Sequence, residues 1–216
     1  MKRLPDLRVP GAAALLLAAA GLAWHGQPGV AQQWEFLAPQ YESRLTERQV
    51  YIDPAELLQL MNDDYIDLLI FDVRDESDWN QFHLADAERV ALDRLPSQRD
   101  RLRALPENAV VVVVSNDEIL ATEAWKRLMV LARPNVYILA GGLNLWLNIY
   151  GVSEEEIAGH AGTSLAQPNG RLRHRFKMAL GARHAAARPD ENLAPQREYT
   201  PKVRLLKKIA KAGGCG

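Results

Sequence analysis

Between positions 50 and 150 the hydrophobic residues fall into short runs separated by segments of mixed polarity. Most of these runs are continuous and rich in β-branched residues, which is typical of strands that are buried on both faces of a sheet. The strongest of them consists of five consecutive valines at 110–114 and has no polar face, so we expect it to be the central strand. In all, the pattern predicts five strands, at residues 50–52, 68–74, 88–92, 110–115 and 136–139.

The segments between these strands carry apolar residues at helical spacing. Asp53 and Pro54 form a typical helix start, because an aspartate caps free N–H groups and proline suits the first helical position. In the helix after the valine run we expect four inward-facing residues, namely Leu120, Ala124, Leu128 and Leu131. Helices are predicted over residues 54–61, 75–82, 94–105 and 121–131, and after Gly142. Strand and helix thus alternate, which predicts an α/β domain with a mainly parallel five-stranded sheet flanked by helices.

The first 31 residues have the form of an export segment. Three basic residues precede an apolar run at 9–24, and small residues follow near Ala31. Sixteen apolar residues are few for a bilayer span, for which about 20 are usual. Both a cleaved signal peptide and an uncleaved membrane anchor therefore fit, and an ordinary amphipathic or buried helix is the remaining alternative. Either export form predicts a periplasmic protein, or a membrane-anchored one that faces the periplasm.

Two further segments flank the predicted domain at 49–151. Residues 32–48 are polar with apolar positions at roughly helical spacing, which indicates a linker or a short amphipathic element. Residues 152–216 form a basic extension that we expect to be partly disordered, with a helical pattern at 172–180. This extension ends in Gly-Gly-Cys-Gly.

The net charge of -1 gives no indication of nucleic-acid binding, but it averages over two unlike parts. From Gly170 to the end, twelve basic residues stand against three acidic ones, so this part carries +9 and the rest about -10. A basic tail is commonly a solvated extension. Beside an N-terminal membrane segment, it could also contact anionic lipid or an acidic protein partner.

Cys215 is the only cysteine, which excludes an intramolecular disulfide bond. It is either an incidental thiol or, behind a lysine-rich arm, a reactive one that accepts sulfur or a disulfide from a partner. The histidines His160, His174 and His184 are too irregularly spaced to form a recognisable metal site with it. We therefore expect neither a metal nor a cofactor.

Four segments of the predicted domain together resemble the rhodanese-like domain family. The resemblance covers about residues 50–150, which is less than half of the chain, and its most specific part is the last segment. The segments are Tyr51-Ile52-Asp53 with Glu56-Leu57-Leu58, Phe71-Asp72-Val73-Arg74 with Asp78-Trp79, His83-Leu84-Ala85-Asp86-Ala87, and Leu139-Ala140-Gly141-Gly142-Leu143 with Trp146. The resemblance implies a single α/β domain of that fold.

In that family, the central strand leads into an active loop that begins with a nucleophilic cysteine and ends with an arginine. A thiolate in such a loop takes up sulfane sulfur, and helix-terminal N–H groups stabilise the negative charge. Here the corresponding positions are Ser115, Asn116, Asp117, Glu118, Ile119 and Leu120. Serine replaces the cysteine, Glu118 a glycine and Leu120 the arginine.

These replacements predict that the loop has lost its chemistry. A serine hydroxyl forms no stable persulfide, and no base for it is evident. Two acidic residues oppose anion binding, because like charges about 4 Å apart repel by roughly 4 kcal/mol near a protein surface. We therefore expect no thiosulfate sulfurtransferase activity and interpret the chain as a non-catalytic binding or regulatory domain with an unidentified protein partner. The alternative is a sulfur-relay or thiol-redox protein acting through Cys215.

Three other polar residues of the domain are interpreted as structural. Asp72 and Arg74 stand at a strand end, where an ion pair or turn anchor is more common than a catalytic pair. His83 is expected to be a hydrogen-bonded core or edge residue.

Overall fold

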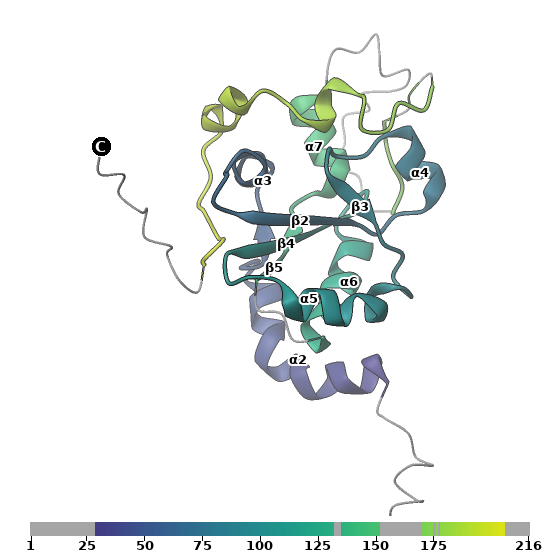
Figure 1. The fold of residues 1–216 in the computed structure, drawn as a ribbon, viewed down its shortest axis with the longest axis vertical. Coiled ribbons are helices and arrows are strands. Elements are labelled where there is room, and N and C mark those ends of the chain that lie inside the picture. The colour runs from purple at the N-terminus through teal and green to yellow at the C-terminus, as the bar shows by residue number, and fades with distance from the viewer. Residues whose placement is uncertain (1–28, 132–134, 152–169, 175, 177, 206–216) are drawn as a thin grey trace, which may run out of the picture.

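The computed structural model describes residues 29–131, 135–151, 170–174, 176 and 178–205. Its centre is a five-stranded sheet in the order β1-β5-β4-β2-β3, in which all neighbouring strands are parallel (Figure 1). The strands are β1 (Tyr51–Ile52), β2 (Asp67–Asp72), β3 (Ala87–Arg89), β4 (Ala109–Val114) and β5 (Val136–Leu139). The predicted α/β fold with a parallel sheet is therefore confirmed.

Helices cover both faces of the sheet. They are α2 (Val30–Thr46), α3 (Pro54–Met61), α4 (Glu76–Gln81), α5 (Arg99–Ala104), α6 (Ile119–Val130) and α7 (Gly142–Tyr150). In Figure 1, α3 and α7 lie above the sheet, and α5, α6 and α2 lie below it. Asp53 caps α3 by accepting a hydrogen bond from the Ala55 N–H at 2.9 Å, with Pro54 at the first position as predicted.

The valine strand β4 is buried on both faces, which confirms the prediction from its sequence. Val110, Val112 and Val114 contribute to the hydrophobic cluster on the α3 and α7 side. Val111 and Val113 contribute to the cluster on the α6 side. Because β4 lies in the middle of the sheet, the loop at its carboxyl end is held by neighbours on both sides.

Several predicted boundaries were wrong. The helix expected at 94–105 is divided into a 3-10 turn, η1 (Leu95–Gln98), and α5, in line with the proline within its first turn. Strand β3 ends at Arg89, three residues early, and α6 begins at Ile119. Leu120 is only half-buried, because the inward stripe of α6 runs instead through Ala121 and Trp125 together with the three other predicted residues.

The segment predicted as a linker or a short amphipathic element is helix α2, which packs on α6. The rings of Trp34 and Tyr41 meet the ring of the buried Trp125 edge to face, with centroids 6.0 and 6.2 Å apart. No helix within the described residues is long and apolar enough to cross a membrane. The predicted export segment lies outside them, apart from its last three residues, and stays a prediction.

We call the described part of residues 170–205 the strap, since it runs along the α3 and α7 side of the domain (Figure 1). Its 3-10 turns are η2 (Ala185–Ala187) and η3 (Glu191–Gln196). Ala186, Ala187 and Ala194 are fully buried in the core cluster on that side. The Trp146 indole N–H also donates to the carbonyl oxygen of Ala186 at 2.7 Å.

The helical pattern at 172–180 gave a wrong prediction. No helix is present in the described part of this segment. Its backbone groups bond to other elements instead: the N–H groups of Leu180 and Gly181 both donate to the Gln81 carbonyl oxygen at 3.2 Å. The Phe176 ring stacks near that of Phe82, with centroids 5.8 Å apart. These contacts hold the segment extended along the end of α4.

Candidate functional site

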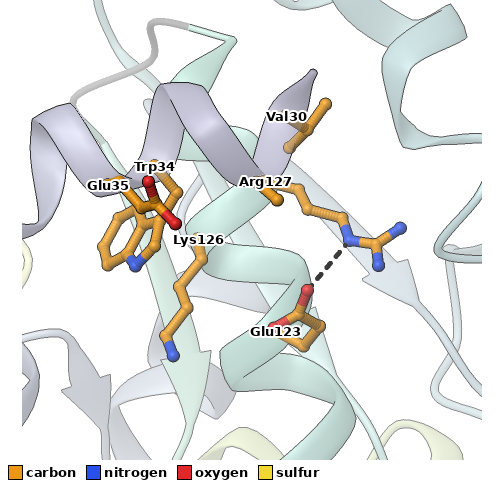
Figure 2. Close-up of a pocket in the computed structure, with 7 residues that line it drawn as sticks. Val30, Trp34, Glu35, Glu123, Lys126 and Arg127 are labelled. Carbon is orange, nitrogen blue, oxygen red and sulfur yellow. Dashed lines mark hydrogen bonds and ion pairs between the residues drawn. The ribbon is translucent and has the colours of Figure 1, made fainter. Parts of the chain in front are cut away.

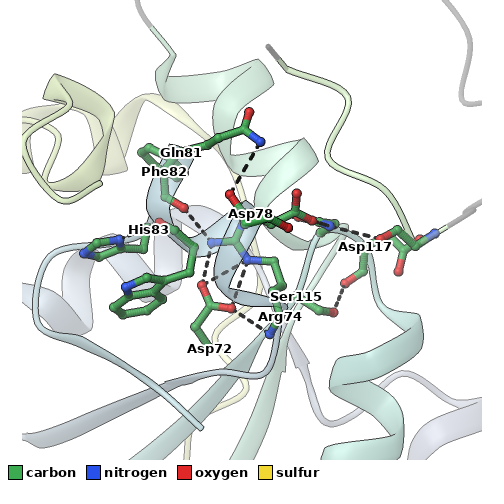
Figure 3. Close-up of polar contacts among 12 residues, drawn as sticks. Asp72, Arg74, Asp78, Gln81, Phe82, His83, Ser115 and Asp117 are labelled. Carbon is green, nitrogen blue, oxygen red and sulfur yellow. Dashed lines mark hydrogen bonds and ion pairs between the residues drawn. The ribbon is translucent and has the colours of Figure 1, made fainter. Parts of the chain in front are cut away.

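Ser115, the first residue after β4, is only 1% exposed, and its hydroxyl is fully engaged. Its Oγ donates to the carbonyl oxygen of Asp117 at 2.5 Å and accepts from the N–H of Ala121 at 3.1 Å (Figure 3). The second bond satisfies a free N–H group in the first turn of α6. Ser115 therefore serves as a structural cap where the resemblance would place a nucleophile.

Beside Ser115, the pair of Asp72 and Arg74 is a buried ion pair, which confirms its structural interpretation. The closest nitrogen and oxygen are 2.6 Å apart, and both side chains are at most 1% exposed. The guanidinium also donates to the Phe82 carbonyl oxygen at 2.6 Å and to Asn116 Oδ1 at 3.1 Å. Arg74 thereby ties the loop to the end of α4, as Figure 3 shows for its labelled residues.

The two acidic side chains of the loop are directed at donors within the protein. Asp117 Oδ1 accepts from the N–H of Ile119 at 2.9 Å, and Oδ2 accepts from the N–H of Gly170 at 2.6 Å. Glu118 forms two hydrogen bonds with the Arg48 guanidinium, at 2.6 and 3.0 Å, and accepts from the Gly141 N–H at 2.7 Å. These bonds to Glu118 raise the pKa of Arg48 above its ordinary value. The carboxylates thus organise the loop.

The remaining two loop positions supply no cation. Ile119 is 49% exposed, and Leu120 packs partly against the core cluster around Trp125. The place at which the family resemblance implies an arginine therefore holds an apolar side chain. A negatively charged sulfur donor would meet no guanidinium from this position.

The glycine pair before α7 permits a close backbone approach to the loop. Gly141 and Gly142 have positive φ, and a Cβ on Gly142 would lie 2.5 Å from the Asp117 carbonyl oxygen. The N–H groups of Leu143 and Asn144 donate to the carbonyl oxygens of Ser115 and Asn116, at 2.8 and 3.0 Å. The glycine motif thus holds the first turn of α7 against the loop.

The start of the strap crosses this same place, a contact that the sequence did not predict. Gly170 donates through its N–H to Asp117, and its carbonyl oxygen accepts from Asn116 Nδ2 at 3.0 Å. Asn144 Nδ2 donates to the carbonyl oxygen of Arg171 at 2.9 Å, and its Oδ1 accepts from the N–H of Arg173 at 2.7 Å. Hydrogen bonds to a backbone leave no side-chain pattern by which the sequence could have revealed them.

His83 has the structural contacts expected of it. Its ring lies flat on that of Trp79, with centroids 3.7 Å apart, and Nδ1 is 2.9 Å from the Trp79 carbonyl oxygen. Within the described residues, no group of three or more potential metal ligands occurs. Cys215 lies outside the described residues, so its proposed reactivity stays a prediction.

A hollow lies between α2 and α6, away from the loop (Figure 2). Lys126 Nζ stands 5.7 Å from the centre of the Trp34 ring, and Arg127 pairs with Glu123 at 3.2 Å. The lining residues are Val30, Ala31, Trp34, Glu35, Glu123, Lys126 and Arg127. None of these residues belongs to the loop or to the strap.

Comparison with known proteins gives one family match. The model of the family described as "Rhodanese-like domain" matches residues 53–149. Among curated proteins, no match was found.

Solved structures with a similar fold include three bacterial proteins. The rhodanese-like domain of an Anabaena protein is 23% identical, with a TM-score of 0.42, and the match covers 59% of this chain and 96% of that one. A Bacillus halodurans protein is 20% identical (TM-score 0.41; coverage 51% and 80%). A Lactobacillus plantarum protein is 21% identical (TM-score 0.40; coverage 51% and 93%).

Proposed function

Since residues 53–149 form a rhodanese-like domain, we propose that this protein uses the domain for binding or regulation and does not transfer sulfur from thiosulfate. The observation that carries the proposal is the burial and hydrogen bonding of the Ser115 side chain. Its side chain is buried, and its hydroxyl proton is directed at a backbone carbonyl oxygen, which cannot act as a general base. An activated serine needs a base within hydrogen-bond reach.

The electrostatics of the loop support the same proposal. A sulfur donor such as thiosulfate is an anion, and it is stabilised by free N–H groups and a guanidinium. Here Asp117 and Glu118 place two carboxylates in the loop, and Leu120 stands at the arginine position. The N–H groups of Ile119, Ala121 and Gly141 already have acceptors within the protein.

The direct test is thiocyanate formation from thiosulfate and cyanide. We expect the full chain and a Ser115→Ala variant to show the same rate as buffer alone. A triple variant, Ser115→Cys with Glu118→Gly and Leu120→Arg, restores the replaced groups and is expected to gain activity, so it controls for the sensitivity of the assay. Turnover by the unmodified chain that is lost in Ser115→Ala would overturn the proposal.

We further propose that the protein is exported, as a periplasmic or membrane-anchored form. The support is the sequence of residues 1–31, with basic residues ahead of an apolar run. Protease added to spheroplasts should degrade the protein, while a cytoplasmic marker stays intact. Protection equal to that of the marker would exclude export.

The alternative role for Cys215 stays a separate hypothesis from the sequence. Intact-mass analysis of the native protein tests it, because a persulfide or a mixed disulfide would add mass that a reductant removes. The absence of any such adduct, together with a Cys215→Ser variant whose partner complexes are unchanged, would exclude it.

A further inference from the structure

We propose that loop 115–118 and the first turn of α7 form a clamp for an extended peptide backbone. Residues 170–174 of the strap occupy this clamp, and a basic peptide from a partner protein competes with them for it. The proposal deepens the binding function above and rests on it, because a loop that transferred sulfur would have to admit a sulfur donor at the same place.

The clamp consists of three polar side chains that bond to successive peptide units. Asn144 forms two hydrogen bonds with one stretch of backbone, to the Arg171 carbonyl oxygen and to the Arg173 N–H. Asn116 and Asp117 bond to the carbonyl oxygen and the N–H of Gly170. Four backbone groups within four residues are thus satisfied by side chains of the domain, and paired donors and acceptors of this kind fix both the direction and the register of a peptide.

Two of the clamp side chains, Asn116 and Asp117, are also held by groups outside the strap. Asn144 is 4% exposed and Asn116 is 2% exposed. Asn116 accepts from the buried Arg74 and donates through Nδ2 to Asp78 as well as to the strap. Because Arg74 and the Ile119 N–H already bond to Asn116 and Asp117, these two side chains are oriented before a backbone binds.

The four hydrogen bonds of the clamp are made to the backbone of the occupant. Leu172 also packs partly against the core, and His174 is half-buried with its Nε2 3.4 Å from the Asn144 carbonyl oxygen. Gly170 adopts φ +74°, a conformation that favours glycine. The structure therefore fits an extended peptide with glycine first and an apolar residue at the third position.

The front and the rear of the strap differ in how firmly they are held. No described residue from 170 to 174 is buried, whereas Ala186, Ala187 and Ala194 are fully buried in the core. Residues 170–174 can therefore leave the clamp while the rear of the strap stays in place. This difference makes the front segment the replaceable part.

Charge favours a basic competitor. Asp117 lies in the clamp, and Asp78 bonds to Asn116. The segment in the clamp carries Arg171 and Arg173. A partner peptide with arginine or lysine at these positions would be attracted by the same carboxylates.

The test uses a synthetic peptide, Gly-Arg-Leu-Arg-His with blocked ends, labelled with a fluorophore and titrated against the full-length protein. A Gly170→Pro variant weakens the built-in occupant, because proline has no N–H for Asp117 and cannot adopt the positive φ. We expect this variant to bind the peptide about tenfold more tightly than the unmodified chain, since it removes one charge-assisted hydrogen bond of the tethered competitor.

Two controls isolate the clamp. In the Gly170→Pro background, Asn144→Ala is expected to weaken peptide binding about tenfold or more, because it removes two hydrogen bonds. Asn148→Ala, at an exposed position of the same helix, should leave binding unchanged. A peptide that is N-methylated at its second arginine lacks the N–H that Asn144 accepts, and it should bind about tenfold more weakly than the parent peptide.

The proposal is overturned if the peptide binds neither chain, or if the N-methylated and parent peptides bind equally well. The comparison of these two peptides on the unmodified protein decides the matter even if Gly170→Pro does not fold. The thiocyanate assay separates this outcome from the function proposed above: a chain with neither turnover nor peptide binding refutes the clamp alone, and a chain with turnover refutes the binding function.

Discussion

Helix α2 and the strap both lie outside the residues that match the family, yet they are attached to the domain in different ways. None of the residues of α2 is buried, and the helix rests on α6 through the aromatic contacts of Trp34 and Tyr41 with Trp125. The strap places fully buried alanines in the core on the opposite side of the sheet (Figure 1). One addition lies on the surface of the domain, and the other completes its interior.

This difference shows that a family match and a packing unit need not share their boundaries. The match ends at residue 149, but Trp146 on α7 donates its indole N–H to the strap at Ala186. Without the strap, the core side of α3 and α7 would be open to solvent. We therefore expect perturbations of the strap to cost more stability than perturbations of α2.

The largest effect is expected for Ala187→Asp. The substitution places a carboxylate at a position with no exposed surface, and an uncompensated buried charge costs about 3–5 kcal/mol. Chemical denaturation of the full chain measures the loss. Ala185→Asp, at an exposed position of the same turn, should change stability by less than about 0.5 kcal/mol. Equal effects of the two variants would show that the strap does not complete the core.

A smaller loss is expected for Trp34→Ala in α2. The variant loses an edge-to-face contact with Trp125 and part of its apolar burial, together about 1–2 kcal/mol. Phe36→Ala is the matched control, since Phe36 lies in the same helix with 84% of its surface exposed. Thermal unfolding followed by far-UV circular dichroism distinguishes the variants, and a loss from Trp34→Ala as large as that from Ala187→Asp would contradict the contrast between the two additions.

The carboxyl of Glu56, which binds the strap, is expected to make the stability of the protein depend on pH. Its Oε1 accepts from the N–H groups of Lys202 and Val203, both at 2.7 Å. Burial raises the pKa of Glu56 above its ordinary value, although these two hydrogen bonds oppose the shift. The folded protein therefore takes up this proton at a higher pH than the unfolded chain does. The contribution of Glu56 to stability is full below the unfolded-state pKa and is lost as the pH rises through the folded-state pKa.

Glu56→Gln removes this titration. As the pH rises from about 4 to about 7, the unmodified protein should therefore lose stability that the variant keeps. The Tm of the variant should rise relative to that of the unmodified protein over this range. Glu191→Gln, in an exposed turn of the strap, controls for the loss of a carboxylate in general. A difference that is constant with pH, or that shifts the other way, would contradict the assignment.

The smallest effect is expected for Arg197→Ala. Arg197 Nε contacts both carboxylate oxygens of Asp53, at 2.9 and 3.1 Å, but the side chain is 42% exposed. Such pairs contribute about 0–1 kcal/mol, and added salt weakens them. Asp53→Ala should cost more, because Asp53 also caps α3. Denaturation at low and at high salt measures both, and a cost for Arg197→Ala that salt leaves unchanged would argue against an ion-pair origin.

Most of the fold was predictable because its signals are local. Continuous valines indicate a strand buried on both faces, and Asp53 with Pro54 marks a helix start. The positions of Ser115 and of the ion pair of Asp72 and Arg74 followed from the same reasoning. The contacts of Gly170 and Asn144 could not be predicted, since they join backbone groups to side chains that are distant in sequence and leave no periodic pattern.

The packing of the strap against the core was not predicted, for a related physical reason. Its many basic residues and prolines are typical of a solvated extension. Its fully buried residues in the core are three alanines, which are too small to stand out in a hydrophobic pattern. The burial of such small side chains can be recognised only when the structure of both contacting surfaces is known.

Lys202 of the strap also bonds to the open edge of the sheet. Strand β1 is an edge strand, and its Tyr51 carbonyl oxygen accepts from Lys202 Nζ at 2.8 Å, as does the Arg48 carbonyl oxygen. An unsatisfied edge strand invites pairing with another chain. Strand β1 is synthesised long before Lys202, so these edge carbonyl oxygens stay without this partner until the end of the strap has been made. A chain that ends between β1 and Lys202 would expose this edge to other chains.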